Sequence, residues 1–186
     1  LVVSEEKYEV HACEAEHSVT TFSYLFKEKE KPGTFYPEKA SALGVPKGKL
    51  WHKLQQGEEI TIENKSIKPS QVMGPNISGK KIGVSGDTRP TRKLEKFFRS
   101  CDYLVFDSTF SDELREKAIQ SCHSTAKEAA VFAKNADVKN LILTHFSARY
   151  KDEKVLLNEA KAIHNSVIAA NRSEEHTSEL QSRAYL

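Results

Sequence analysis

Short apolar runs separated by helical patterns dominate the chain after residue 79. The runs KIGVS, DYLVF, NLILT and SVIA predict buried strands at 81–85, 102–106, 140–144 and 166–169. Between them, apolar residues at helical spacing predict helices at about 91–99, 112–120 and 153–163. A further helix is predicted to open at Ser124 as its N-cap, with a face of Ala126, Ala129, Ala130 and Ala133. Strands that alternate with helices indicate an α/β layered domain.

The first part of the chain has a different pattern. Residues 8–14 and 19–26 predict two strands, with Glu16-His17-Ser18 between them. From 27 to 69, glycine and proline interrupt short amphipathic pieces, and a small hairpin is predicted at 58–69. This segment is predicted to be an inserted arm at about 31–69 rather than part of the main core.

Composition narrows the class of protein only moderately. The 186 residues carry a formal net charge of +2, too small by itself to indicate a nucleic-acid partner. No apolar stretch is long enough to cross a bilayer, so no membrane association is expected. The three cysteines lack CxxC spacing and are interpreted as reduced thiols of an intracellular protein.

The last residues do not continue the apolar pattern, which stops at Ala170. Residues 172–182 read RSEEHTSELQS and resemble a translated sequencing adapter. The segment 171–186 is therefore predicted to be an unstructured tail outside the fold.

Polar clusters follow three of the predicted strands. They are Gly86-Asp87-Thr88, Asp107-Ser108-Thr109 and Thr144-His145-Phe146-Ser147. The carboxyl ends of parallel strands lie along one edge of a sheet, where ligands bind. Carboxylates and an imidazole at that edge suit a metal site or an acid/base centre.

Each of these residues also has a purely structural interpretation. Asp87 could cap a helix, and His145 could be a hydrogen-bonded core histidine. His123 could simply precede the Ser124 cap, or act as an acid/base group beside a helix terminus. His17 could be an ordinary surface histidine in a turn.

The combination is more specific than its members. SGDTRP, HSTA and THFSARY, in this order, resemble ribonuclease Z, the metallo-β-lactamase-fold endonucleases that trim the 3′ end of precursor tRNA. The resemblance runs from about Tyr8 to Ala170, and EHSV matches another histidine motif of the family. It implies that residues 1–170 form the C-terminal portion of an αββα four-layer sandwich whose N-terminal half is missing.

The resemblance also implies roles for individual residues. His17 would bind the first of two zinc ions, Asp87 would bridge both, and His145 would bind the second. His123 would transfer a proton and Arg149 would contact phosphate, while a metal-activated hydroxide attacks the phosphodiester. Further expectations are a homodimer, a cytoplasmic location and a precursor tRNA partner held by exposed lysines of the arm: Lys39, Lys47, Lys49 and Lys53.

Three departures from the family pattern matter. The chain contains no His-x-His-x-Asp-His motif, so further zinc ligands are expected upstream and the fragment is expected to be inactive alone. Phe106-Asp107-Ser108-Thr109 stands where the family has His-Glu-Ala-Thr, and Gly48-Lys49 stands where the arm usually has Gly-Pro. The alternatives are another phosphodiesterase or hydrolase of this fold, or a noncatalytic half that binds RNA or forms dimers.

Overall fold

The computed structural model describes residues 1–170, and the tail predicted at 171–186 lies outside the described residues. Two compact units emerge. The larger comprises 1–4, 9–27 and the chain from 81 onward, and the smaller comprises 5–8 and 28–80. The arm predicted at 31–69 lies within the smaller unit. Among the described helices, none has the length and apolar character needed to cross a bilayer.

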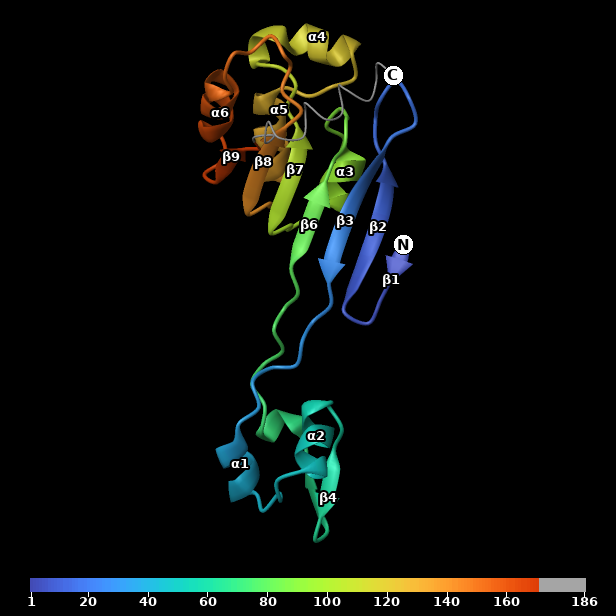
Figure 1. The fold of residues 1–186 in the computed structure, drawn as a ribbon, viewed down its shortest axis with the longest axis vertical. Coiled ribbons are helices and arrows are strands. Elements are labelled where there is room, and N and C mark those ends of the chain that lie inside the picture. Colours follow the sequence, from blue (N-terminus) through green and yellow to red (C-terminus); the bar gives the residue numbers. More distant parts are fainter. Residues whose placement is uncertain (171–186) are drawn as a thin grey trace, which may run out of the picture. The chain divides into compact units, whose positions relative to one another are not determined.

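A seven-stranded sheet forms the larger unit of the described chain, in the order β1-β2-β3-β6-β7-β8-β9 (Figure 1). Strands β6 to β9 run parallel, and β3 pairs antiparallel with β6. The sheet is therefore mixed, with its parallel half formed by the strands that the apolar runs predict. The strands are β1 (Val3–Ser4), β2 (Tyr8–Glu14), β3 (Phe22–Glu28), β6 (Lys81–Val84), β7 (Tyr103–Asp107), β8 (Asn140–Thr144) and β9 (Val167–Ala169).

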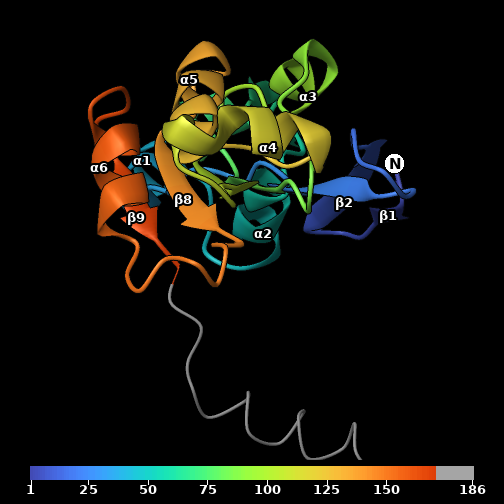
Figure 2. The same ribbon diagram turned by 90° about the horizontal axis from the view of Figure 1, so that it is seen from above.

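Helices cover one face of this sheet, and Figure 2 shows α3 and α5 gathered on the same side of the strands. Leu104, Phe106, Leu141 and Leu143 of β7 and β8 are fully buried against these helices. Phe132 of α5 lies with its ring 4.5 Å from that of Phe106. The helical segments are α3 (Arg92–Phe97), η2 (Asp112–Leu114), α4 (Arg115–Gln120), α5 (Ala126–Asn135) and α6 (Lys154–Lys161).

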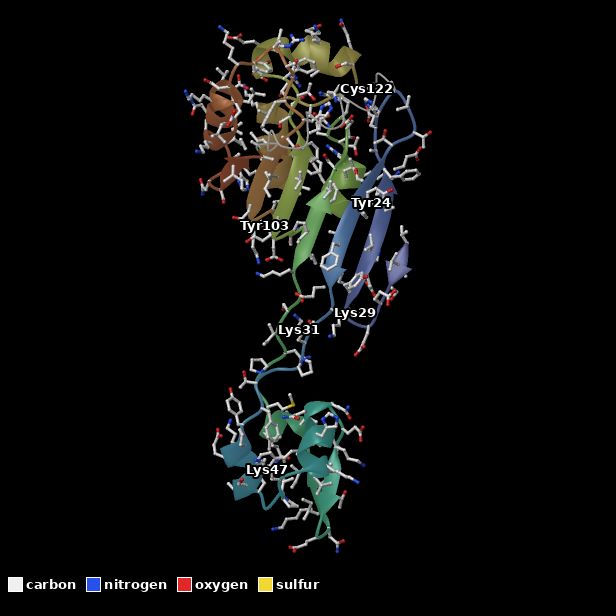
Figure 3. The ribbon with its side chains drawn as sticks, in the orientation of Figure 1. Tyr24, Lys29, Lys31, Lys47, Tyr103 and Cys122 are labelled. Atoms are coloured by element: carbon white, nitrogen blue, oxygen red, sulfur yellow. The ribbon has the colours of Figure 1, made fainter. Side chains whose placement is uncertain are left out.

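The opposite face of the sheet is apolar and open in the described chain. Tyr24, Ile82, Val84 and Tyr103 project from this face and are 37–45% exposed (Figure 3 labels Tyr24 and Tyr103). The apolar runs predict buried strands, and in the described residues this burial holds for the helix-covered face only. These strands carry apolar side chains on both faces, but in the described chain helices cover only one of the two faces.

Two local predictions need correction. Thr125, not Ser124, is the N-cap of α5: its hydroxyl accepts a hydrogen bond from the Glu128 backbone N–H, and Glu128 completes a capping box. The Ser124 hydroxyl instead donates to the Thr88 carbonyl at 2.6 Å. The second strand begins at Phe22 rather than at residue 19, because Ala15 N–H bonds the Thr21 carbonyl and closes a loop there.

The smaller unit has a core of its own. Buried Val45, Leu54 and Val72 pack together, and the Trp51 indole N–H donates to the Val45 carbonyl at 3.0 Å. The predicted hairpin is confirmed as β4 and β5. Gly48 precedes α2 with φ +132°, a conformation that favours glycine, so the Gly48-Lys49 pair keeps the residue that this turn requires. The elements are α1 (Pro37–Ala42), α2 (Lys49–Gln55), β4 (Ile60–Ile62), β5 (Lys65–Ile67) and η1 (Pro69–Gln71).

Candidate metal centre

Four residues with metal-binding side chains meet at the carboxyl edge of the parallel strands. Asp87 follows β6, Asp107 ends β7, His145 follows β8 and His123 lies just before α5. Ligand atoms from all four lie within 4.8 Å of one another. The edge predicted from the polar clusters therefore gathers their Asp87, Asp107 and His145, and His123 joins them from the loop before α5.

Asp87 and His145 form the exposed side of this cluster. The His145 Nε2 lies 3.6 Å from an Asp87 carboxylate oxygen, and the two side chains are 46% and 42% exposed. Two ligands of one tetrahedral zinc ion lie about 3.3 Å apart, given zinc–ligand bonds of about 2.0 Å. His145 has φ +64°, an uncommon backbone conformation for a residue other than glycine, and such strain concentrates at functional sites.

The hydrogen bonds of His145 select its tautomer. The Thr109 hydroxyl lies 2.7 Å from an Asp107 carboxylate oxygen, to which it can only donate. The same hydroxyl lies 2.8 Å from His145 Nδ1, so it accepts the Nδ1–H there. The Nε2 lone pair of neutral His145 consequently faces Asp87, as a metal-binding imidazole requires.

Asp107 is a positioning group rather than a free ligand. Its side chain has no exposed surface, and one oxygen accepts from Thr109 N–H at 3.0 Å and from the Thr109 hydroxyl. The other oxygen lies 3.1 Å from Thr88 N and 2.8 Å from His123 Nδ1. Four contacts occupy the lone pairs of the carboxylate, so Asp107 orients His123 and Thr109.

His123 lies between two other imidazoles. Its ring stacks on that of His145 at 4.9 Å and lies 5.0 Å from that of His17. His17 Nδ1 is 3.1 Å from the Cys122 carbonyl, which can only accept, so the nitrogen carries the hydrogen. Each of the three histidines therefore uses Nδ1 for a protein contact and keeps Nε2 available.

Arg89 connects the loops that carry these side chains. Its guanidinium binds both carboxylate oxygens of Glu128 and the His123 carbonyl, and the Nη1 to Glu128 distance is 2.7 Å. Its backbone N–H donates to the Glu16 carbonyl at 2.9 Å, beside His17. Burial is the largest single effect and raises the pKa of Glu128, but the Arg89 hydrogen bonds, the Thr125 backbone N–H and the charges of Arg89 and Arg115 together lower that pKa overall.

The remaining predicted residues lie outside the cluster. Arg149 is exposed, with its Nε 2.9 Å from the Ser147 hydroxyl and its guanidinium 4.9 Å from the Phe110 ring, which in turn lies 6.4 Å from the His123 ring. The arm lysines are all exposed on the smaller unit, and Figure 3 labels one of them, Lys47. The sequence did not single out Asp107, Thr109 or Arg89 as site residues; the polar cluster after β7 was the available signal for the first two.

Solved structures define the class of protein. The metallo-beta-lactamase fold protein YhfI from Bacillus subtilis matches 91% of this chain and 49% of its own, with a TM-score of 0.57 and 14% identity. Human tRNase Z, short form, matches 92% of this chain and 43% of its own, with a TM-score of 0.55 and 22% identity. The chain therefore has a metallo-β-lactamase fold, of which it spans a part.

Curated relatives specify the family resemblance. Ribonuclease Z of Nitrosopumilus maritimus is 61% identical over 169 residues, and that of Methanosarcina acetivorans is 44% identical over 170 residues. Each match covers 91% of this chain and 56% of the relative, so the chain spans about half the length of the curated relatives it matches. No family model matches the chain. The predicted resemblance to ribonuclease Z is confirmed over this shared length.

Proposed function

We propose that this chain contributes the metal centre and the arm of a ribonuclease Z-type endoribonuclease that removes the 3′ trailer of precursor tRNA. The observation that carries the proposal is the cluster of Asp87, His145 and His123, formed at one sheet edge in a chain 61% identical to a Ribonuclease Z. His145 with an available Nε2 and the exposed Asp87 carboxylate are donors that suit a hydrolytic metal site, and His123 beside them suits proton transfer.

Carboxylate and imidazole donors suit zinc in type, and the 3.6 Å between Asp87 and His145 suits two ligands of one ion, whereas His17 lies outside the four-residue cluster. His17, Asp87 and His145 would hold two ions, with Asp87 shared between them, as the family resemblance implies. When bound, the ions would lower the pKa of a water molecule and polarise the phosphoryl oxygens. Three donors do not complete two four-coordinate sites, so we propose that the part of the relatives that this chain does not span supplies the rest, and that the chain alone is inactive.

The chain's own residues would handle the proton and the phosphate. Asp107 holds His123 with its Nδ1–H fixed, which leaves Nε2 for proton transfer. Protonated Nε2 would give its proton to the departing 3′ oxygen as the phosphorus–oxygen bond breaks, and Asp107 would stabilise the imidazolium before that step. The guanidinium of Arg149 offers paired donors that match phosphate oxygens.

The arm would hold the body of the tRNA. Five lysines and one glutamate lie between residues 31 and 53, with aromatic side chains among them. The Lys39 ammonium lies 4.3 Å from the centre of the Tyr36 ring. Exposed cations of this kind bind RNA by backbone and shape rather than by sequence.

A chimera tests the proposal. The segment of the Nitrosopumilus maritimus Ribonuclease Z that matches over 169 residues is replaced by this chain. We expect precursor tRNA cleavage and about two bound zinc ions per protomer. Asp87→Ala and His145→Ala should remove both properties, whereas His123→Ala should remove cleavage and keep the metal. Glu116→Ala, an exposed carboxylate on α4, is the matched control. A fully active Asp87→Ala chimera would refute the site.

The arm separates tRNA processing from other phosphodiester chemistry. Deleting residues 31–68 should cripple tRNA cleavage and spare a small chromogenic phosphodiester. Equal loss of both activities would favour another phosphodiesterase or hydrolase of this fold. A noncatalytic half would instead bind tRNA as the isolated chain, and the chimera would neither bind zinc nor cleave. The homodimer and the cytoplasmic location stay predictions from the family resemblance.

A further inference from the structure

A basic pocket lies on the helix-covered side of the sheet, away from the metal centre. It has a volume of about 460 Å³ and opens beside Lys81, which begins β6, whereas Asp87 follows the other end of that strand. Five residues lie between them, and the six steps of extended chain span at most about 22 Å. Its lining comes from β2, β3, β6 and the end of α3: His11, Leu25, Lys27, Lys81, Lys96, Phe97, Arg99 and Ser100.

Two of these lysines are direct cross-strand partners. Lys27 of β3 pairs in register with Lys81 of β6, one pair beyond Phe26 and Ile82. Like charges placed directly opposite each other destabilise a sheet, because their side chains stand about 5 Å apart. Lys96 and Arg99 bring two further cations to the same pocket. An anion bound between these groups would relieve this repulsion.

The fold supplies no such anion itself. No acidic residue lines the pocket, and no carboxylate in the described part of the chain forms an ion pair with Lys27, Lys96 or Arg99. Two carboxylates adjoin lining residues, and both are already hydrogen-bonded, so they are outnumbered by the four cations of the lining. Glu9 binds His11 at 3.1 Å, and Asp102 accepts from the Lys81 backbone N–H and the Lys139 ammonium, both at 2.9 Å. The pocket therefore keeps an unbalanced positive charge.

An apolar surface lies among the cations. Leu25 and Phe97 line the pocket, and both are only partly buried against the main core. A bare inorganic anion gains nothing from such a surface. A ligand that joins phosphates to flat bases can use both parts, since aromatic side chains stack with bases and basic grooves follow the backbone.

We propose that this basic pocket binds backbone phosphates of single-stranded RNA at a distance from the metal centre. The identification of RNA as the polyanion rests on the proposed function. The charge imbalance and the adjoining aromatic ring are independent of it. The pocket would hold a part of the transcript that neither the metal centre nor the arm contacts.

A charge-matched pair of triple variants tests the pocket. Lys27→Gln, Lys96→Gln and Arg99→Gln are combined in the chimera, and the control combines Lys117→Gln, Lys134→Gln and Lys161→Gln, three exposed lysines on α4, α5 and α6. Binding of a short unstructured RNA is followed by fluorescence anisotropy at several salt concentrations. The pocket variant should bind at least about tenfold more weakly at about 0.1 M salt, with a salt slope shallower by about 2, as for three lost phosphate contacts.

The outcomes separate the pocket from the proposed function. Hydrolysis of the chromogenic phosphodiester and the zinc content should be the same in both triple variants. Equal RNA affinity in the pocket variant and the control would overturn the pocket, whatever the chimera cleaves. Chemical modification of Lys96 is then compared in the presence of pyrophosphate and in the presence of RNA. Protection by pyrophosphate but not by RNA would assign the pocket to free oligophosphates and overturn the RNA proposal. If the chimera cleaves no RNA but the pocket variant alone loses RNA binding, the pocket stands and the proposed function falls.

Discussion

His123 Nδ1 lies 2.8 Å from a carboxylate oxygen of Asp107, a side chain with no exposed surface. Burying a carboxylate costs folding free energy unless the group is paired and hydrogen-bonded, and Asp107 has four such contacts. The pair holds one imidazole in one orientation and one tautomer at the edge where Asp87 and His145 meet. This hydrogen bond joins the end of β7 to the loop before α5.

Asp107→Asn should separate proton transfer from metal binding. The amide cannot stabilise an imidazolium, so cleavage by the chimera should slow by about 10²- to 10⁴-fold. Zinc content should change little, because Asp107 has no free lone pair for a metal. Cleavage rates and metal analysis check this, with Asp137→Asn on the surface as control. Loss of zinc would make Asp107 a ligand.

Thr109 should tune the metal affinity through His145. In Thr109→Val the Nδ1–H of His145 loses its acceptor, and such losses around a metal ligand typically cost about 10- to 100-fold in affinity. Thr109→Ser keeps the hydroxyl and should retain most of the affinity. Zinc competition with a chelator measures both variants. Equal weakening in the two would contradict a role of the hydroxyl, since Thr109→Ser keeps it.

Arg89 should matter for stability as well as for the site. Arg89→Met leaves Glu128, which is 12% exposed, without its main partner and should cost about 3 kcal/mol in the free energy of unfolding. The control is Arg115→Met, since Arg115 also contacts Glu128 at 3.3 Å but is 63% exposed. It should cost less than about 1 kcal/mol. Chemical denaturation measures both costs.

The ion pair of Arg89 and Glu128 also predicts how the free energy of unfolding depends on pH. The pKa of Glu128 is lowered in the folded chain, from an ordinary value of 4.5. The stability that ionised Glu128 contributes is therefore complete above pH 4.5. It is lost as the pH falls through the lower pKa that Glu128 has in the folded chain. Without Arg89, burial would raise that pKa, so Arg89→Met should lose less stability than the parent on acidification. Parallel acid titrations of unfolding would contradict this reading.

The open face of the sheet predicts opposite effects in two contexts. Tyr24 and Val84 are cross-strand partners there, 45% and 43% exposed. In the isolated chain, Tyr24→Thr with Val84→Thr should reduce binding of a hydrophobic dye and change stability by less than about 0.5 kcal/mol. In the chimera, where the remaining part of the relative should cover this face as the second layer of the sandwich, the same change should cost about 2 kcal/mol or more. Equal effects in both would contradict such a layer.

Thiol reactivity should differ among the three free cysteines. Burial raises the pKa of Cys101 to about 11, so its thiolate is scarce at neutral pH. Cys13 and Cys122 are only partly buried. A thiol reagent near neutral pH should label these two quickly and Cys101 only after unfolding. Mass spectrometry of the labelled peptides identifies the order, and early labelling of Cys101 would contradict the core packing around it.

Much of the strand and helix order could be predicted from local patterns. The apolar runs at 81–85 and 140–144 became β6 and β8, because a short apolar run between turns has few other stable forms. The N-cap of α5 could not be decided this way. Ser124 and Thr125 can both cap a helix through a hydroxyl. The Ser124 hydroxyl instead donates a hydrogen bond to the carbonyl of Thr88, 36 residues away.

The sequence alone determined that polar clusters follow successive parallel strands, and therefore that Asp87, Asp107 and His145 share an edge. Only the tertiary structure decided what each does there. His17 reaches a carbonyl 105 residues away and His145 a hydroxyl 36 residues away, and these bonds choose which nitrogen remains available. Such contacts depend on how distant loops pack, which no local pattern of residues encodes.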